Sequence, residues 1–524
     1  MKPINKITLL LILLWPIITV AHDFEVDGIY YNSSYGNKAI VTYRGTSYNA
    51  YTNEYSGDVT IPSTVSYDGM TYSVTSIGYN AFNGCTKLAS IDIPNTVTQI
   101  EWDAFENCSG LTSVNIPNTV TLIGNYAFKG CTGLTDVTIP NSVTTIGGDA
   151  FYGCTGLRSI TIPKSVTRIG GYAFGGCSNL TSLHYNAISC SDFSSSSPFY
   201  NLNITNIDIG NEVERIPAYF GYLLEKLTNI IIPNNVHSIG ESAFAYCTEL
   251  TDVNIPNSVI SIGNDAFRSC RSLINIIIPN TLTFIGDRMF MGCISLTDVN
   301  IPSSVVSIGN YALSGCTGLT NVTIPNSVKS IGIFAFSGCT GLTDVTIPNS
   351  VTSIKGEAFE GCTGLTRVTI SDSISNINLK TFYGCSNLNN VIVPNSVITI
   401  GDDAFASCSK LTNVIIGNSV ATIGYNAFYQ CEILSDVTCL AEIPPVISGE
   451  NCFYPAYTFA TLHVPAQSVS VYKSTPYWIR FSNIVGDATG GGSNDSDYMK
   501  CDTNGDGEVN IADVNRVIDA ILNH

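Results

Sequence analysis

Residues 134–154 read LTDVTIPNSVTTIGGDAFYGC, and residues 342–362 repeat this pattern as LTDVTIPNSVTSIKGEAFEGC. The same unit recurs along the chain and can be aligned on the apolar residue that usually precedes proline. Successive aligned residues are 23 apart, except for one step of 24 after Tyr185, a first step of 32 and a last step of 25. The 18 aligned positions are Ile61, Ile93, Ile116, Ile139, Ile162, Tyr185, Ile209, Ile232, Ile255, Ile278, Ile301, Ile324, Ile347, Ile370, Val393, Ile416, Cys439 and Val464. A fixed period of roughly 20 to 29 residues predicts a solenoid of stacked coils.

A single coil illustrates how the repeat is expected to fold. Val137 and Ile139 alternate with polar residues, which is typical of a short strand with one buried face. Pro140 lacks a backbone N–H and is therefore placed where that strand ends. Ile146 returns to the core, and Gly147 is expected to form a tight corner. Because no coil can bury its apolar side alone, neighbouring coils should stack about 4.8 Å apart and share one core.

Equivalent residues of stacked coils must form columns. One column is aromatic, and its regular spacing predicts rings packed on each other in the core rather than a sugar-binding surface. Its members are Phe82, Phe105, Phe128, Phe151, Phe174, Phe244, Phe267, Phe290, Phe336, Phe359, Phe382, Phe405 and Phe428, and Leu313 takes the place once.

A second column is made of cysteine. These side chains point the same way, which suits disulfide geometry poorly, so free buried thiols are expected. Disulfides are the alternative, because exported chains with many cysteines usually form them. The pattern does not assign the thiol or disulfide state of Cys190, Cys452 or Cys501. The column comprises Cys85, Cys108, Cys131, Cys154, Cys177, Cys247, Cys270, Cys293, Cys316, Cys339, Cys362, Cys385, Cys408 and Cys431.

Composition excludes several classes of function. The chain has 524 residues, of which only 12% are charged, and a formal net charge of −18. Nucleic acids and anionic membranes require a basic surface, so neither is expected as a partner. The five histidines are scattered, and no nucleophile elbow, phosphate loop or metal-ligand spacing occurs in the repeats. The sequence therefore predicts a protein that is not an enzyme.

Residues 1–21 have the pattern of a secretory signal peptide. Lys2 and Lys6 precede an apolar run from Ile7 to Val20, and cleavage is expected near Ala21. A membrane anchor is the alternative, but this run is shorter than the roughly 20 residues that a spanning helix needs. The mature chain is expected to be secreted, extracellular or at the cell surface, without a membrane span.

The remaining segments define the predicted domain organisation. Residues 22–58 contain alternating, aromatic-rich stretches and are expected to be a β cap on the first open edge. Residues 59–465 carry the repeats, of which the irregular part, 186–226, is interpreted as a surface loop or a local bend. Residues 466–485 are the predicted C-terminal cap, and residues 486–497 are a Gly/Ser/Asp linker.

The segment 498–524 contains a candidate metal site. A calcium loop of twelve residues places oxygen ligands at positions one, three, five, seven, nine and twelve, with glycine at six. An apolar face at helical spacing follows the loop. Calcium is therefore the predicted cofactor, and an acidic turn in a solvated tail is the alternative. The predicted ligands are Asp502, Asn504, Asp506, Glu508 through its backbone, Asn510 and Asp513, which replaces the usual glutamate.

The coil pattern L-x-x-V-x-I-P-x-x-V-x-x-I-G-x-x-A-F-x-G-C resembles the BspA-like leucine-rich repeat of bacterial and some parasite surface proteins. The resemblance implies a right-handed β-solenoid of about 18 coils with short parallel strands. It also implies attachment to host matrix proteins or to neighbouring cells. The segment 498–522 resembles one repeat of a type I dockerin, which implies calcium binding and cohesin as a partner. A dockerin carries two such repeats, and one is present here.

The outward-pointing strand residues are the candidate binding surface. Exposed apolar residues that interrupt polar columns often mark contacts, whereas the simplest alternative is a merely soluble sheet face. The candidate residues are Ile231, Asp252, Asn254, Ile277, Asp298, Asn300, Ile392 and Ile415. We expect them to bind a protein or glycan ligand in adhesion or protein–protein interaction. The alternatives are a dockerin-bearing scaffold component of polysaccharide-degrading glycoside hydrolase complexes, and a rigid spacer.

Overall fold

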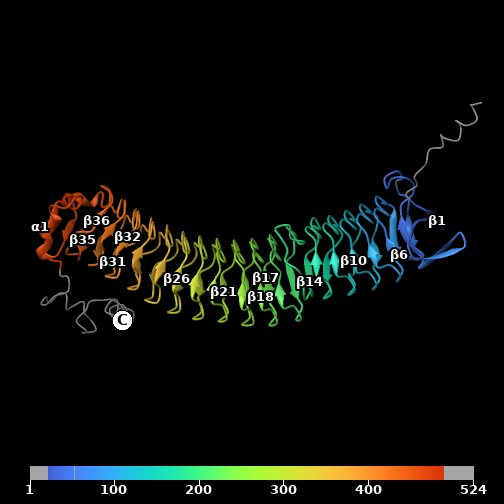
Figure 1. The fold of residues 1–524 in the computed structure, drawn as a ribbon, viewed down its shortest axis with the longest axis horizontal. Coiled ribbons are helices and arrows are strands. Elements are labelled where there is room, and N and C mark those ends of the chain that lie inside the picture. The colour runs from blue at the N-terminus through green and yellow to red at the C-terminus, as the bar shows by residue number, and fades with distance from the viewer. Residues whose placement is uncertain (1–21, 52, 489–524) are drawn as a thin grey trace, which may run out of the picture. The chain divides into compact units, whose positions relative to one another are not determined.

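The computed structural model describes residues 22–51 and 53–488. Two compact units are described separately here: unit 1 ends at Val213 and unit 2 begins at Glu214. Both are parallel-strand β-solenoids with little helix, and the chain forms about 18 coils with a period of about 23 residues, as the sequence predicts (Figure 1). The predicted signal peptide and the predicted calcium segment lie outside the described residues.

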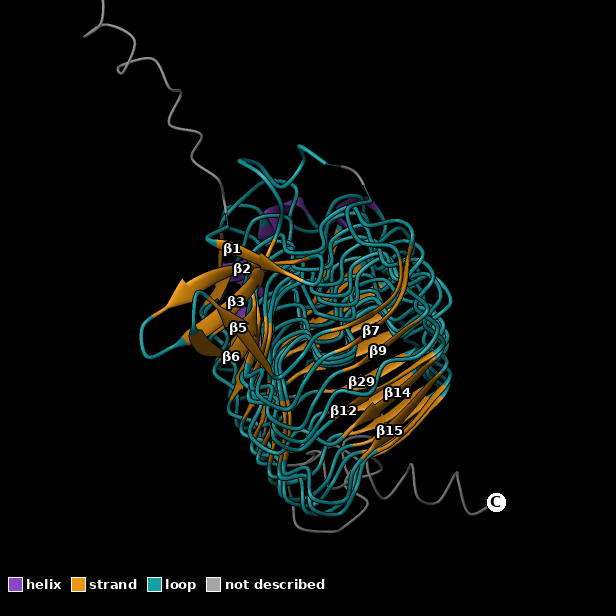
Figure 2. Ribbon diagram, turned by 90° about the vertical axis from the view of Figure 1, so that its right-hand side faces the viewer, coloured by secondary structure: helices purple, strands orange, loops and turns teal. Residues whose placement is uncertain are grey.

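Among its described residues, 22–51 and 53–213, unit 1 has strands and no helix. A nine-stranded sheet runs in the order β1-β2-β3-β6-β8-β10-β11-β13, with β5 paired to β6. Two three-stranded sheets, β4-β7-β9 and β12-β14-β15, carry the longer strands of the coils, and these lie along one side of the unit in Figure 2. The strands are β1 (Phe24–Val26), β2 (Ile29–Ser34), β3 (Lys38–Thr42), β4 (Gly57–Thr60), β5 (Thr64–Tyr67), β6 (Met70–Ile77), β7 (Leu88–Asp92), β8 (Gln99–Ile100), β9 (Ser113–Asn115), β10 (Leu122–Ile123), β11 (Thr145–Ile146), β12 (Ser159–Ile162), β13 (Arg168–Ile169), β14 (Ser182–Tyr185) and β15 (Asn206–Ile209).

Unit 2 repeats a longer and a shorter strand in almost every coil. Its longer strands form the sheets β17-β19-β21, β23-β25 and β27-β29-β31-β33-β35-β37-β38, and its shorter strands form β16-β18-β20, β22-β24-β26-β28 and β30-β32-β34-β36. The longer strands are β17 (Asn229–Ile231), β19 (Asp252–Asn254), β21 (Asn275–Ile277), β23 (Asp298–Asn300), β25 (Asn321–Thr323), β27 (Asp344–Thr346), β29 (Arg367–Thr369), β31 (Asn390–Val393), β33 (Asn413–Ile416), β35 (Asp436–Cys439), β37 (Thr461–His463) and β38 (Asn483–Val485).

The shorter strands of unit 2 have two residues each. They are β16 (Arg215–Ile216), β18 (Ser238–Ile239), β20 (Ser261–Ile262), β22 (Phe284–Ile285), β24 (Ser307–Ile308), β26 (Ser330–Ile331), β28 (Ser353–Ile354), β30 (Asn376–Ile377), β32 (Thr399–Ile400), β34 (Thr422–Ile423) and β36 (Val446–Ile447). The helical elements among the described residues of the unit are η1 (Ala456–Thr458), η2 (Ala466–Ser468), α1 (Val469–Tyr472) and η3 (Trp478–Arg480).

The phenylalanine column forms the core of each unit, as predicted. In unit 1, the ring of Phe151 is fully buried between Phe128 and Phe174, with centroid distances of 5.2 and 5.3 Å. In unit 2, Phe382 and Phe405 stack in the same way at 5.3 Å. These near-parallel rings exclude the sugar-binding interpretation of the column, because no ring face is open to a ligand.

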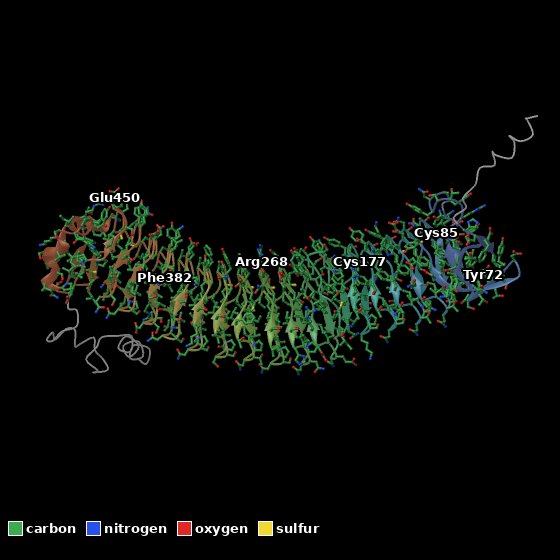
Figure 3. The ribbon with its side chains drawn as sticks, viewed as in Figure 1. Tyr72, Cys85, Cys177, Arg268, Phe382 and Glu450 are labelled. Atoms are coloured by element: carbon green, nitrogen blue, oxygen red, sulfur yellow. The ribbon has the colours of Figure 1, made fainter. Side chains whose placement is uncertain are left out.

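The cysteine column lies beside the rings. All 17 cysteines among the described residues are buried and outside disulfides, which agrees with the expectation of free thiols in the column. The Cys108 thiol donates a hydrogen bond to the Phe82 carbonyl oxygen at 3.0 Å, and Cys131 repeats the contact with Phe105 at 3.1 Å. Figure 3 labels Cys85 and Cys177, the first and last members of the column in unit 1. From Cys108 to Cys431, each thiol of the column donates in this way to a carbonyl of the preceding coil.

The coil corners differ from the prediction. Asp149 and Gly153 have φ angles of 52° and 71°, so the chain turns through left-handed residues at these two positions. Gly147 is not left-handed. A Cβ atom at Gly147 would lie 2.4 Å from the backbone nitrogen of Asn125 in the preceding coil. The role predicted for Gly147 is therefore wrong, because its lack of a side chain permits close stacking of coils while the turn lies beyond it.

The irregular segment also differs from the prediction. In unit 1, β15 pairs in parallel register with β14, and its residues Ile207 and Ile209 are buried. The ring of Phe199 continues the aromatic stack against Phe174 at 5.7 Å. In unit 2, Phe220 is fully buried. The segment thus contributes core residues to both units, and its interpretation as a surface loop is wrong because its apolar residues occupy core positions despite the altered spacing.

Candidate binding surface

The candidate site residues lie on one face of unit 2, which we call the long-strand face. It comprises the outward side chains of β17, β19, β21, β23, β25, β27, β29, β31, β33, β35, β37 and β38. Each of these strands alternates, so that Val253 of β19 is buried while Asp252 and Asn254 on either side are exposed. The parallel register then places equivalent outward residues of successive coils directly beside each other.

Two exposed isoleucines flank an asparagine on this face. Ile231 lies opposite Asn254 on the neighbouring strand, and Asn254 in turn lies opposite Ile277. Ile231 is 73% exposed and Ile277 is 65% exposed. Because adjacent strands are about 4.8 Å apart, the two isoleucines are about 10 Å apart. We call these three residues the isoleucine patch.

Carboxylates border the isoleucine patch. Asp252 and Asp298 are exposed on β19 and β23, and Asn300 is exposed beside Asp298. Further along the face, Arg367 Nε donates to a carboxylate oxygen of Asp344 at 3.0 Å and compensates its charge. Among the described residues, no ion pair engages Asp252 or Asp298. The surroundings of the isoleucine patch are therefore negative as well as partly apolar.

The other two predicted isoleucines form a separate pair. Ile392 and Ile415 lie directly opposite each other on β31 and β33. Ile392 is 49% exposed, whereas Ile415 is only partly exposed. Ile415 lies between Ile392 and Thr438, so neighbours on both strands cover part of its side chain. This pair offers less apolar surface than the isoleucine patch does.

The sequence interpretation missed apolar residues on, or directly before, the shorter strands of unit 2. Ile260 is 62% exposed, Phe284 is 44% exposed and Val306 is 46% exposed. They belong to three consecutive coils, and their positions carry Thr or Ser in most other repeats. That departure from the repeat was a detectable signal. Ile260, Phe284 and Val306 extend the apolar surface of these coils beyond the longer strands.

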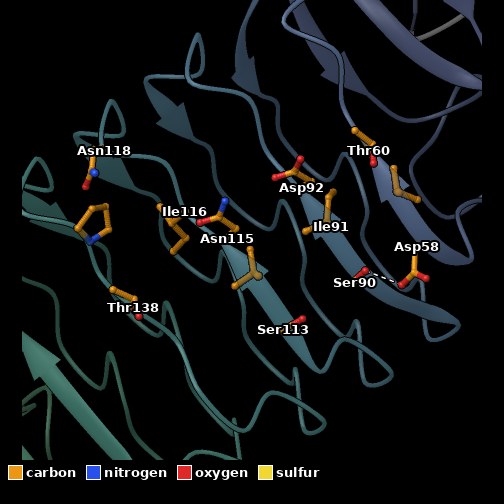
Figure 4. A pocket seen from close by; sticks show the side chains of 13 residues that line it. Asp58, Thr60, Ser90, Ile91, Asp92, Ser113, Asn115, Ile116, Asn118 and Thr138 are labelled. Atoms are coloured by element: carbon orange, nitrogen blue, oxygen red, sulfur yellow. Dashed lines mark hydrogen bonds between the residues drawn. The ribbon is translucent and has the colours of Figure 1, made fainter.

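Unit 1 has a shallow hollow on its own longer strands, with a volume of about 520 Å³. Asp58, Ser90, Asp92, Ser113 and Asn115 line it, as Figure 4 shows. The Ser90 hydroxyl donates a hydrogen bond to the Asp58 carboxylate. Polar side chains occupy these positions in most coils, so the sequence interpretation did not single out this stretch.

The described residues contain few groups that could bind a metal ion or act as a nucleophile. No group of three or more His, Cys, Asp or Glu side chains that could hold a metal ion occurs among residues 22–51 and 53–488. The predicted calcium ligands, Asp502 to Asp513, lie outside that part of the chain. Burial raises the pKa of the Cys177 thiol to about 12, so a reactive thiolate is not formed there at neutral pH. Within the described residues, no helix has the length and apolarity needed to cross a membrane.

The repeated coils assign the chain to a known class of proteins. The stacked coils define a leucine-rich repeat protein. Residues 49–186, 192–320 and 306–435 match the model of the family described as "BspA type Leucine rich repeat region", in six copies. The chain belongs to this BspA-type family.

The chain is similar to solved structures, and the first of these agrees with the assignment. A leucine-rich repeat protein from Bacteroides ovatus ATCC 8483 is 31% identical, with a TM-score of 0.50, over 80% of this chain and 94% of its own. A leucine rich cell surface protein from Faecalibacterium prausnitzii A2-165 is 27% identical, with a TM-score of 0.30, over 83% of this chain and 96% of its own. Among curated proteins, none matches the chain.

Proposed function

We propose that this protein is a non-catalytic surface protein that binds another protein through the isoleucine patch, in adhesion to host matrix or to neighbouring cells. Proteins of the BspA type are typically surface proteins, and leucine-rich repeat solenoids typically bind proteins. The single observation that carries the proposal is the exposure of Ile231 and Ile277, on either side of Asn254, on a polar sheet face. An N-terminal signal peptide, cleaved near Ala21, would export the chain.

The physical basis is the unfavourable hydration of these side chains. Covering an apolar surface contributes about 25 cal/mol per Å² removed from water, so two largely exposed isoleucines favour a covered state. Asp252 and Asp298 add an uncompensated negative border, which favours a partner with basic side chains around an apolar centre. Together these features describe a small apolar core within a polar rim, as in protein interfaces.

The test compares variants of the full-length protein. Ile231→Asp with Ile277→Asp should abolish binding to immobilised matrix proteins and to bacterial cells, measured by surface plasmon resonance and by cell attachment. Ile443→Asp is the matched control, because Ile443 is 83% exposed but lies outside the longer strands. Ile392→Asp with Ile415→Asp tests the second pair. Unchanged binding of the Ile231/Ile277 variant would refute the role of the isoleucine patch.

We further propose that residues 502–513 bind calcium, with cohesin as a candidate partner. The support is the sequence spacing of oxygen ligands, together with the dockerin-like pattern of 498–522. The alternative function that follows is a component associated with polysaccharide-degrading complexes. Calorimetric titration of the full chain with calcium, beside Asp502→Ala with Asp506→Ala, tests the site, and capture by a cohesin panel tests the partner. Equal calcium binding by both proteins would refute the assigned ligands.

A further inference from the structure

A second hollow lies on the nine-stranded sheet of unit 1. It has a volume of about 580 Å³, which is within the range of small-ligand sites. It spans β2, β3, β6 and β8, which are consecutive neighbours within the nine-stranded sheet. The register of β3 against β6 shifts between Ala39 and Ile40. Such an irregularity redirects outward side chains, and it occurs here inside the hollow.

Exposed aromatic rings surround this hollow. Tyr43 and Tyr79 line it, and Tyr79 is 57% exposed. Trp102 of the next coil is 50% exposed and meets Tyr79 edge to face, with ring centroids 6.2 Å apart. Tyr48 is 43% exposed and meets Tyr43 at 6.3 Å. Tyr48, Tyr79 and Trp102 differ from the buried phenylalanine column, because they are exposed to solvent.

The polar lining is mixed and balanced. Asn32 and Gln99 contribute amides, which both donate and accept hydrogen bonds. Lys38 and Glu101 contribute one positive and one negative group. Burial raises the pKa of Glu101, while a hydrogen bond from the Tyr79 side chain lowers it by a smaller amount. The hollow therefore has no net charge but many donors and acceptors.

We propose that this hollow binds a neutral oligosaccharide. A sugar ring has an apolar C–H face, which fits the exposed ring of Tyr79, and hydroxyl groups that fit Asn32, Gln99 and Glu101. The site is separate from the isoleucine patch of unit 2 and does not depend on the function proposed for it.

An extended peptide fits less well. Peptides that bind sheets usually add a strand to an open edge. Here β3, β6 and β8 each have a paired neighbour on both sides. The strand β2 pairs with β3 as far as Ser34 and with β1 over residues 29–31, so only a short stretch of strand edge is open. A peptide would therefore depend mainly on side-chain contacts. Among the described residues that line the hollow, Ile40 is the one aliphatic side chain.

The test is isothermal titration calorimetry of the full-length protein with purified neutral tetrasaccharides. The panel contains β-1,4-glucan, α-1,4-glucan, β-1,4-mannan and β-1,4-galactan tetrasaccharides. Tyr79→Ala should weaken binding of the recognised sugar at least tenfold, and Gln99→Ala at least threefold. Tyr425→Ala is the matched control, because residues 78–82 and 424–428 both read GYNAF and Tyr425 is 47% exposed. It should leave binding unchanged.

Three results would overturn the proposal. The first is the absence of saturable binding of the wild-type protein to any panel member. The second is equal weakening by Tyr79→Ala and Tyr425→Ala, which would indicate a site elsewhere. The third is a protein ligand that loses affinity with Tyr79→Ala while the sugars do not. Thermal unfolding of each variant verifies that it is folded, and the Ile231/Ile277 variant should bind the sugar normally, which separates this site from the isoleucine patch.

Discussion

Replacing Phe151 by alanine tests how the solenoid is held together. The ring is fully buried between Phe128 and Phe174, and removal of a buried phenylalanine typically costs about 3–5 kcal/mol. The lower value requires the neighbours to collapse into the gap. Here the backbone resists collapse, because Phe128 N donates to Ala150 O and Phe151 N donates to Ala173 O, both at 2.7 Å. We therefore expect Phe151→Ala to lower the free energy of unfolding by about 4–5 kcal/mol.

The same column supplies the control. Leu313 occupies the phenylalanine position natively and is fully buried, so Phe151→Leu should lose only about 1–1.5 kcal/mol. Native-state hydrogen exchange measured by mass spectrometry gives the local opening free energies of the coils. Because repeats interact mainly with their neighbours, the loss should concentrate in the coils around residue 151. A loss below about 1 kcal/mol for Phe151→Ala, or equal losses for both variants, would refute this reasoning.

Three further predictions concern the thiols, the close coil contacts and the pH dependence. In non-reducing buffer, the 17 buried cysteines should resist alkylation in the native protein and all react after denaturation, counted by mass spectrometry; mass loss from oxidation would contradict this. Gly147→Ala should lower the urea midpoint more than Gly148→Ala, because the added Cβ would lie 2.4 Å from backbone at Gly147 but no closer than 3.5 Å at Gly148. The expected decrease in the free energy of unfolding for Gly147→Ala is about 1–3 kcal/mol. Equal urea midpoints for the two variants would contradict this prediction. Burial raises the pKa of Asp149, so its contribution to stability is complete below the unfolded-state pKa and is lost as the pH rises through the folded-state value. Asp149→Asn should therefore be more stable than wild type at about pH 7, with a difference that shrinks toward about pH 4, and a constant difference in urea midpoint would argue against this.

Much of the fold was predictable because the spacing of the repeat fixes which residues stack on each other. The column containing Phe151 and the column containing Cys154 each follow from the period, since residues 23 apart must stack once the coils do. The free thiols also followed, because parallel side chains in one column do not present disulfide geometry. The strands β2 and β3 were anticipated from the alternating, aromatic-rich stretches in residues 22–58.

Other features depend on contacts with residues of neighbouring coils, which the local sequence does not reveal. Gly147 looked like a corner, but its conformation is ordinary and its constraint is Asn125 of the preceding coil. Phe199 lies outside the regular spacing, yet it completes the ring stack against Phe174. Ile415 had the pattern of an exposed residue, and its exposure is reduced by side chains on both adjacent strands.

The sequence by itself determined the solenoid, the inward and outward faces of each strand, and the candidate calcium ligands, because these depend on spacing along the chain. Only the tertiary structure decided which outward residues form surfaces. Ile231 and Ile277 join across Asn254 through strand register, and Tyr79, Asn32 and Gln99 meet across four strands. The physical reason is that a period fixes what each coil buries, whereas a binding surface depends on which side chains from separate segments are left uncovered together.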